Sequence, residues 1–150
     1  MKALLIIAAL LTTISGKAQF SLKKELPSMV CFFGAGFFEG TAETLQFHYS
    51  EFENKTEANA GFWNPELSWR NKYKGGLPEN GAKHFGSTTF LAWTTDGYHL
   101  MRTSRNVSAM VGILITPRDK LKWHGYLLKA LCYSLAYQAG FHLSYTLIYS

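Results

Sequence analysis

Residues 87–105 read STTFLAWTTDGYHLMRTSR, an apolar run of helix length that four ionisable side chains interrupt. Asp96, His99 and Arg102 follow one another at intervals of three residues, and Arg105 lies three residues further on. Side chains at this spacing lie on one side of an α-helix and can contact one another. We therefore expect either one long helix that begins at the start of this stretch or two shorter helices with a break near residues 104–106. In both cases the polar cluster is turned toward neighbouring helices.

A second helical pattern occupies residues 28–50, where Gly36 and Gly40 form a Gly-x-x-x-Gly pair. Such a pair allows another helix to approach closely. Glu39 and Glu43 lie one turn apart beside these glycines. Carboxylates at this spacing usually form the solvated face of a helix, but the neighbouring CFFGAGFF is apolar on all sides, which favours an inward position for Glu39.

A third pattern runs from residue 123 to the end of the sequence. Ser134, Gln138, His142 and Tyr145 occur at intervals of four, four and three residues, so they form one polar stripe on a largely apolar helix. The three patterns together predict an all-α fold, a small bundle of three long helices with one short helix in the middle connection.

The middle connection, residues 51–86, is rich in Asn, Gly and charged residues. Asn64, Pro65 and Glu66 form a helix-start signal, because Asn caps the first turn and proline fits the first helical position. We expect a short helix from Pro65 to about Tyr73. Aromatic and basic side chains around it favour either a belt at a membrane interface or an aromatic lid over the bundle. They are Trp63, Trp69, Tyr73, Arg70, Lys72 and Lys74.

The composition is that of a folded chain, since 47% of its 150 residues are hydrophobic and only 17% are charged. This length corresponds to one domain, which we place at residues 19–150. A mean hydropathy of -0.04 leaves both membrane and aqueous environments open. The glycine pair and the aromatic-basic connection favour a bundle embedded in a membrane.

Residues 1–18 have the features of a targeting segment. Lys2 precedes an unbroken apolar run over residues 3–11, and small residues at 16 and 18 frame a cleavage pattern. The segment is predicted to be a signal peptide or an N-terminal anchor. It directs the chain to the bacterial cell envelope, with the inner membrane favoured and the periplasm as the alternative.

The net charge of +5 arises from bases scattered among acids, which does not favour nucleic acid as a partner. The expected partners are membrane lipid and either another protein or a second copy of the chain. Cys31 and Cys132 lie in apolar surroundings and are expected to be buried thiols, with a disulfide as the alternative.

The three polar stripes would bring carboxylates and imidazoles together inside the bundle. Glu43, Asp96, His99 and His142 are the predicted ligands of a single zinc, iron or manganese ion, with Glu39 as a general base acting on a metal-bound water. The alternative is a buried network in which a carboxylate pairs with an arginine of the 87–105 segment and the histidines only satisfy hydrogen bonds.

Four segments resemble those of small uncharacterised bacterial proteins with a signal-like start and predicted membrane helices. These are GFFEGTAETLQFHY, FWNPELSWRNKYKGG, FGSTTFLAWTTDGYHLMR and GFHLSYTLIY. The similarity covers most of residues 34–149. It implies an envelope location and a helical architecture, and it assigns no activity.

These observations predict a small envelope membrane protein with a structural or accessory role and a buried polar cluster. The alternative from another class is a metal-dependent membrane hydrolase or oxidase that uses the carboxylate and histidine site. A third reading is an exported helical domain whose polar pocket binds a small molecule.

Overall fold

The computed structural model describes residues 20–149, so the predicted signal peptide or anchor in residues 1–18 lies outside the described residues. Within residues 20–149 the regular secondary structure is helical, and the only β pairing is an isolated bridge between Tyr73 and Ala82. The all-α prediction is confirmed.

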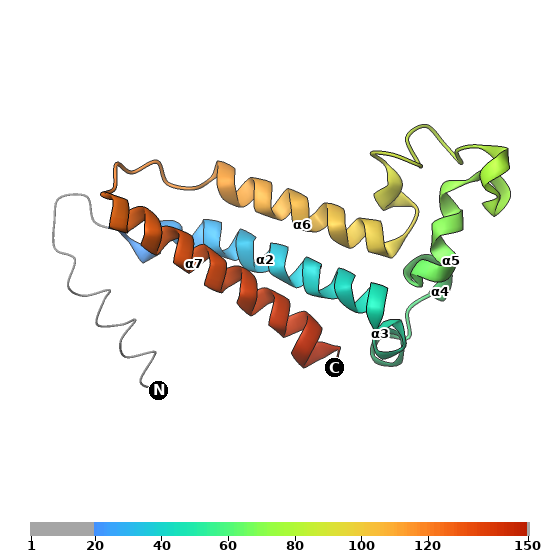
Figure 1. Cartoon of the computed structure of the whole chain (residues 1–150), viewed down its shortest axis with the longest axis horizontal. Coiled ribbons are helices and arrows are strands. Elements are labelled where there is room, and N and C mark those ends of the chain that lie inside the picture. The colour runs from blue at the N-terminus through green and yellow to red at the C-terminus, as the bar shows by residue number, and fades with distance from the viewer. Residues whose placement is uncertain (1–19, 150) are drawn as a thin grey trace.

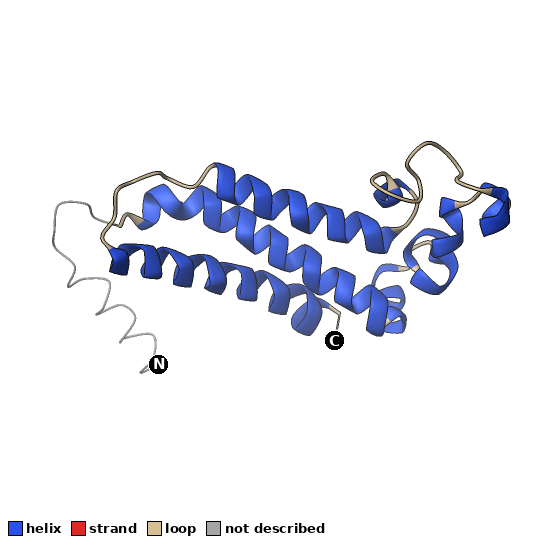
Figure 2. Ribbon diagram, turned by 45° about the horizontal axis from the view of Figure 1, so that its top comes forward, coloured by secondary structure: helices blue, strands red, loops and turns tan. Residues whose placement is uncertain are grey.

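Three helices lie side by side and form the body of the molecule (Figure 1, Figure 2). They are α2 (Leu22–Phe47, 26 residues), α6 (Gly97–Leu114, 18 residues) and α7 (Trp123–His142, 20 residues). The central helix is α2, because it packs against both α6 and α7. Beyond α7 the chain continues in π-helical turns over Leu143–Ile148.

The α2 and α7 backbones touch at glycines of both helices. A Cβ atom at Gly36 would lie 1.9 Å from the carbonyl oxygen of Tyr137, and one at Gly140 would lie 2.0 Å from that of Phe33. At Gly40 the nearest atom would be only 2.2 Å away. No side chain fits at these positions, so the predicted close approach of a second helix at the glycine pair is confirmed.

Small side chains fill the rest of the contact surface of α2. Ala35, Ala42 and Leu45 are almost fully buried. The buried Thr41 and Thr44 hydroxyls donate hydrogen bonds to the carbonyl oxygens four residues earlier, at 3.0 and 2.9 Å, so they leave no unpaired polar group in the core.

The beginning of α2 differs from the prediction. The helix begins at Leu22 and contains Pro27 in its interior, although proline is expected in a first turn. The turn of α2 that precedes Pro27 is stabilised by tertiary contacts of the buried Glu25. Its carboxylate pairs with Lys129 Nζ on α7 at 2.9 Å and accepts a short hydrogen bond from the Tyr133 hydroxyl.

The predicted start of α6 near residue 87 is wrong. Residues 86–95 form turns, including a 3₁₀ helix at Ala92–Thr94, and the α-helix begins only at Gly97. Asp96 is the N-cap, where its Oδ1 accepts a hydrogen bond from the backbone N–H of His99 at 2.8 Å. Asp96 therefore lies just before the first turn of α6 and caps it, instead of lying on one face of a longer helix.

The middle connection contains three short α-helices where the sequence predicted one. The predicted Asn64 cap is confirmed, because its Oδ1 accepts a hydrogen bond from the Glu66 N–H at 2.9 Å. Trp63 packs on the backbone of Gly97, where a Cβ atom would lie 2.2 Å from the indole ring. The helices are α3 (Tyr49–Thr56), α4 (Ala60–Trp63) and α5 (Pro65–Ser68), followed by 3₁₀ turns at Trp69–Lys72, Lys74–Gly76 and Pro78–Asn80.

The membrane-spanning helices expected of an embedded bundle are not found in residues 20–149. None of the helices there is both long enough and apolar enough to cross a membrane. Charged and polar residues break the apolar runs, among them Glu39 and Glu43 in α2 and Lys129 and Gln138 in α7.

Replacing Gly36 by alanine tests the backbone contact. The added methyl group would overlap the Tyr137 carbonyl, so α2 and α7 must separate, and the free energy of unfolding should fall by about 1–3 kcal/mol. Gly34→Ala is the matched control, because the nearest atom to its new Cβ is 3.8 Å away. This control should gain about 0.5–1 kcal/mol from helix propensity.

Urea unfolding followed by circular dichroism measures both variants. If Gly36→Ala is as stable as Gly34→Ala, the α2–α7 contact described above is wrong.

Candidate functional site

The predicted metal ligands are not gathered in one place. Among the residues the structure describes, no three His, Cys, Asp or Glu side chains lie close enough to hold a metal ion together. Asp96 and His99 lie at the start of α6, Glu43 lies on α2, and His142 ends α7. The four predicted ligands thus come from three different helices, and they do not form a common cluster.

Asp96 and His99 form a structural cluster with Lys72. His99 Nδ1 lies 2.8 Å from Asp96 Oδ1, and Lys72 Nζ lies 3.7 Å from Asp96 Oδ2. Burial alone would raise the pKa of Asp96, but hydrogen bonds from the His99 side chain and backbone, together with the charges of His99 and Lys72, lower it. Through its ion pair with Lys72, the Asp96 carboxylate links the start of α6 to the middle connection.

Glu39, the predicted general base, is held in an ion pair. Arg105 Nη1 donates a hydrogen bond to Glu39 Oε2 at 2.6 Å, and each side chain is only about one fifth exposed. Arg105 also donates to the Asn106 side-chain oxygen at 3.0 Å through Nε. The alternative offered by the sequence paired a carboxylate with an arginine in this way, but the observed pair is only partly buried. A catalytic role for Glu39 stays a prediction.

Glu43 lines a cavity of about 300 Å³ beside this ion pair. Glu39, Tyr137, Gln138 and Phe141 complete the lining, so the α2 and α7 polar stripes do meet. Burial raises the pKa of the Tyr137 phenol, and the negative charges of Glu39 and Glu43 raise it further. The phenol therefore remains a hydrogen-bond donor at neutral pH.

His142 is exposed at the end of α7. Its Nδ1 lies 3.1 Å from the Thr146 hydroxyl, within the same C-terminal segment. The imidazole thus contacts none of the predicted metal partners.

Sequence patterns missed the most deeply buried ion pair, Glu25 with Lys129. Both residues are less than 10% exposed, and Lys129 also donates to the Pro117 carbonyl at 2.8 Å. Lys129 could have been noticed as the one base within an otherwise apolar helical stretch. Glu25 gave no signal, since it stands in a charged run that looked like a connector. Cys31 and Cys132 are both free thiols.

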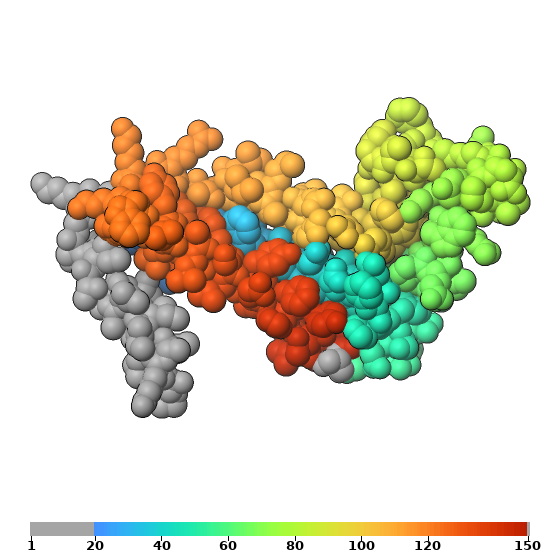
Figure 3. All heavy atoms as spheres, in the orientation of Figure 1, coloured from blue at the N-terminus to red at the C-terminus, as the bar shows by residue number. Residues whose placement is uncertain are grey.

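Large apolar side chains are exposed where α2 begins, α6 ends and α7 begins. Figure 1 places these three termini at the same end of the molecule, and Figure 3 shows the end of α6 and the start of α7 there. On α2 and α7 the exposed residues recur at intervals of four, and on α6 they lie three and four residues after Met110, which makes an outward apolar stripe on each helix. We name this surface the apolar end. It comprises Leu22, Leu26 and Val30, Met110, Ile113 and Leu114, and Trp123, Leu127 and Leu131, each 47–74% exposed.

Basic side chains lie beside the apolar end. Arg118, Lys120 and Lys122 are exposed in the connection between α6 and α7. Lys24 at the start of α2 approaches this connection and lies 3.4 Å from Asp119. Exposed apolar side chains, a tryptophan and bases therefore lie together at this end of the bundle.

No protein-family model, curated protein or solved structure matches this chain.

Asp96→Asn tests the cluster at the start of α6. Asparagine also caps helices, so the change removes mainly the charge and should lower the free energy of unfolding by about 1–3 kcal/mol at pH 7. The folded-state pKa of Asp96 is lowered, so its charge stabilises the fold above the unfolded pKa of about 3.9, and this contribution is lost as the pH falls through the folded pKa. The free energies of unfolding of the wild type and the variant should therefore become equal at pH values below the folded-state pKa of Asp96.

Asp119→Asn serves as the control, because Asp119 pairs with the exposed Lys24 and should contribute less than about 1 kcal/mol. Thermal unfolding at several pH values measures all three proteins. An Asp96→Asn difference that does not shrink in acid would contradict the assigned role of the charge.

Proposed function

We propose that this chain is a small accessory protein of a bacterial envelope membrane, and that its apolar end binds the membrane surface. The observation that carries the proposal is the exposed apolar stripe on each of α2, α6 and α7 at one end of the bundle. Burying a fully exposed leucine side chain gains about 1.5–3 kcal/mol, and these partly exposed side chains gain a share of that when lipid covers them. Membrane lipid is a partner that can cover all three stripes at once.

The charge around the apolar end supports a lipid partner. Arg118, Lys120 and Lys122 would lie at the level of the headgroups while Trp123 enters the interface. Each base near an anionic bilayer contributes about 1 kcal/mol. A partner of this kind explains why bases and exposed apolar residues occur together.

The course of the chain also supports this orientation. Ser21 directly precedes α2, so the apolar segment of residues 3–11 is joined by the chain to the start of α2, at the same end of the bundle. An uncleaved anchor in that segment would hold the apolar end against the bilayer. After cleavage, the apolar end itself would maintain the contact.

The metal-dependent hydrolase or oxidase has no supporting observation in residues 20–149. The histidines and carboxylates that it needs lie in separate places, and Asp96 and Glu39 are engaged in ion pairs. An accessory role, in which the polar residues hold the helices together, uses these contacts as they stand.

Flotation with lipid vesicles tests the proposal. The chain from residue 20 onward should float with vesicles that contain anionic lipid, and should do so less in high salt, because salt screens the attraction of the bases. Replacing Leu114 and Leu127 together by glutamine should weaken binding at least about tenfold, given the value of burying a leucine.

Phe85→Gln with Phe90→Gln is the matched control, since these two rings are 84% and 64% exposed in the turns that precede α6, away from the apolar end. Both double variants change exposed residues and should fold normally. The proposal fails if the phenylalanine variant loses binding while the leucine variant keeps it, or if neither variant changes it.

A further inference from the structure

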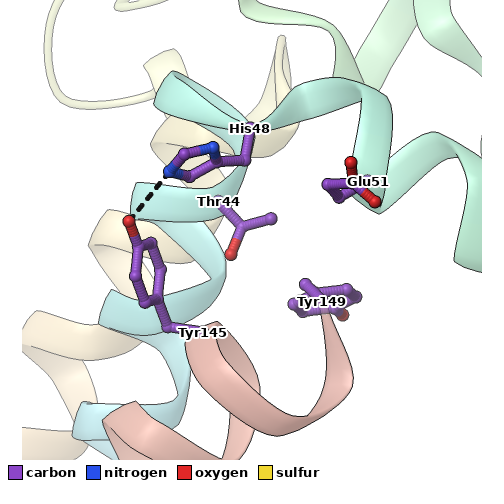
Figure 4. Close-up of a pocket in the computed structure, with 5 residues that line it drawn as sticks. All are labelled: Thr44, His48, Glu51, Tyr145 and Tyr149. Atoms are coloured by element: carbon purple, nitrogen blue, oxygen red, sulfur yellow. Dashed lines mark hydrogen bonds between the residues drawn. The ribbon is translucent and has the colours of Figure 1, made fainter.

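A separate cavity of about 260 Å³ lies at the other end of α2, beside the C-terminal turns. Figure 4 shows its lining, with His48 and Tyr145 on one side, Glu51 and Tyr149 on the other, and Thr44 between them. These residues come from the last turn of α2, the break after it, α3 and the C-terminal segment.

Helix irregularities from two parts of the chain shape this cavity. The backbone at His48 leaves the helical conformation, with φ −140° and ψ 43°, which separates α3 from α2. On the facing segment, the wide turns of Leu143–Ile148 precede Tyr149. Wide π-type turns are rare and are frequent at functional sites. The irregularities place two tyrosine rings, an imidazole and a carboxylate around one space.

The tyrosine rings are held in place from behind. Tyr145 stacks on Phe141 with ring centroids 5.2 Å apart, and Tyr149 packs on the buried Phe52 at 5.1 Å. The Tyr145 hydroxyl also lies 2.9 Å from His48 Nε2. Rings fixed in this way lose little conformational freedom when a ligand binds.

The charges favour a positively charged ligand. Glu51 is exposed, and among residues 20–149 its carboxylate belongs to none of the ion pairs. No lysine or arginine lines the cavity. Aromatic faces attract cations, most strongly organic ammonium groups, and a nearby carboxylate adds to this attraction.

The geometry points to a binding site for a small alkylammonium cation, in which Tyr145 and Tyr149 contact the methyl or methylene groups and Glu51 balances the charge. Thr44 lies at the base of the site and is fully buried. This site lies at the opposite end of α2 from the apolar end, so the inference does not depend on the proposed membrane contact.

Calorimetric titration of the full chain with choline tests the inference. Choline should show saturable binding, whereas 3,3-dimethylbutan-1-ol, its uncharged analogue of the same shape, should not. Tyr149→Leu should weaken choline binding by roughly 3- to 30-fold, the range expected for one cation–π contact, and Tyr149→Phe should retain it.

Glu51→Gln should weaken choline binding, and Glu53→Gln should not, because Glu53 lies on the same helix but does not line the cavity. Dihexanoyl phosphatidylcholine, used as a monomer, distinguishes the source of the ammonium group. Tighter binding than choline would assign the site to a lipid headgroup, and weaker binding would assign it to a free small molecule.

Either result with phosphatidylcholine supports an alkylammonium site, provided that Glu51→Gln weakens the binding. The inference is overturned if choline shows no saturable binding, if the uncharged analogue binds equally well, or if Glu51→Gln and Glu53→Gln bind choline alike.

Discussion

The backbone contact between α2 and α7 is the constraint on which the rest of the structure depends. Gly36, Gly40 and Gly140 allow the two helices to approach until carbonyl oxygens meet the space where side chains would otherwise be. This contact fixes how far one helix can slide along the other. It therefore decides which polar residues meet along the seam, from Glu25 with Lys129 at one end to His48 with Tyr145 at the other.

A seam of small residues has a consequence for the outside of the bundle. Glycine, alanine and threonine occupy the contact surface of α2, so many large apolar side chains of the three helices point outward. A monomer in water seldom exposes so much apolar surface in one place without a partner for it. The same packing thus stabilises the bundle and creates the apolar end. The irregular C-terminal turns lie beyond the glycine contacts and line the cavity at the other end of α2.

Helical periodicity predicted the all-α fold and the close approach at Gly36, because both depend on residues near in sequence. It failed where tertiary contacts decide the outcome. The spacing of Asp96 fitted the interior of a helix, yet its side chain caps the first turn of α6. Glu25 lies in an additional turn of α2 before Pro27, and its ion pair with Lys129 on α7 stabilises that turn. The metal site could not be judged by spacing within helices, since it depends on which side chains of different helices lie close together.

The most direct test of the account is the depth of the apolar end in a membrane. Nitroxide labels at positions 114 and 80, in a background without the two native cysteines, can be compared for collisions with oxygen, which concentrates in the bilayer, and with a polar nickel complex, which stays in water. On binding anionic vesicles, position 114 should gain oxygen and lose nickel accessibility, while position 80 should keep both. Equal behaviour at the two positions would contradict a membrane contact through the apolar end.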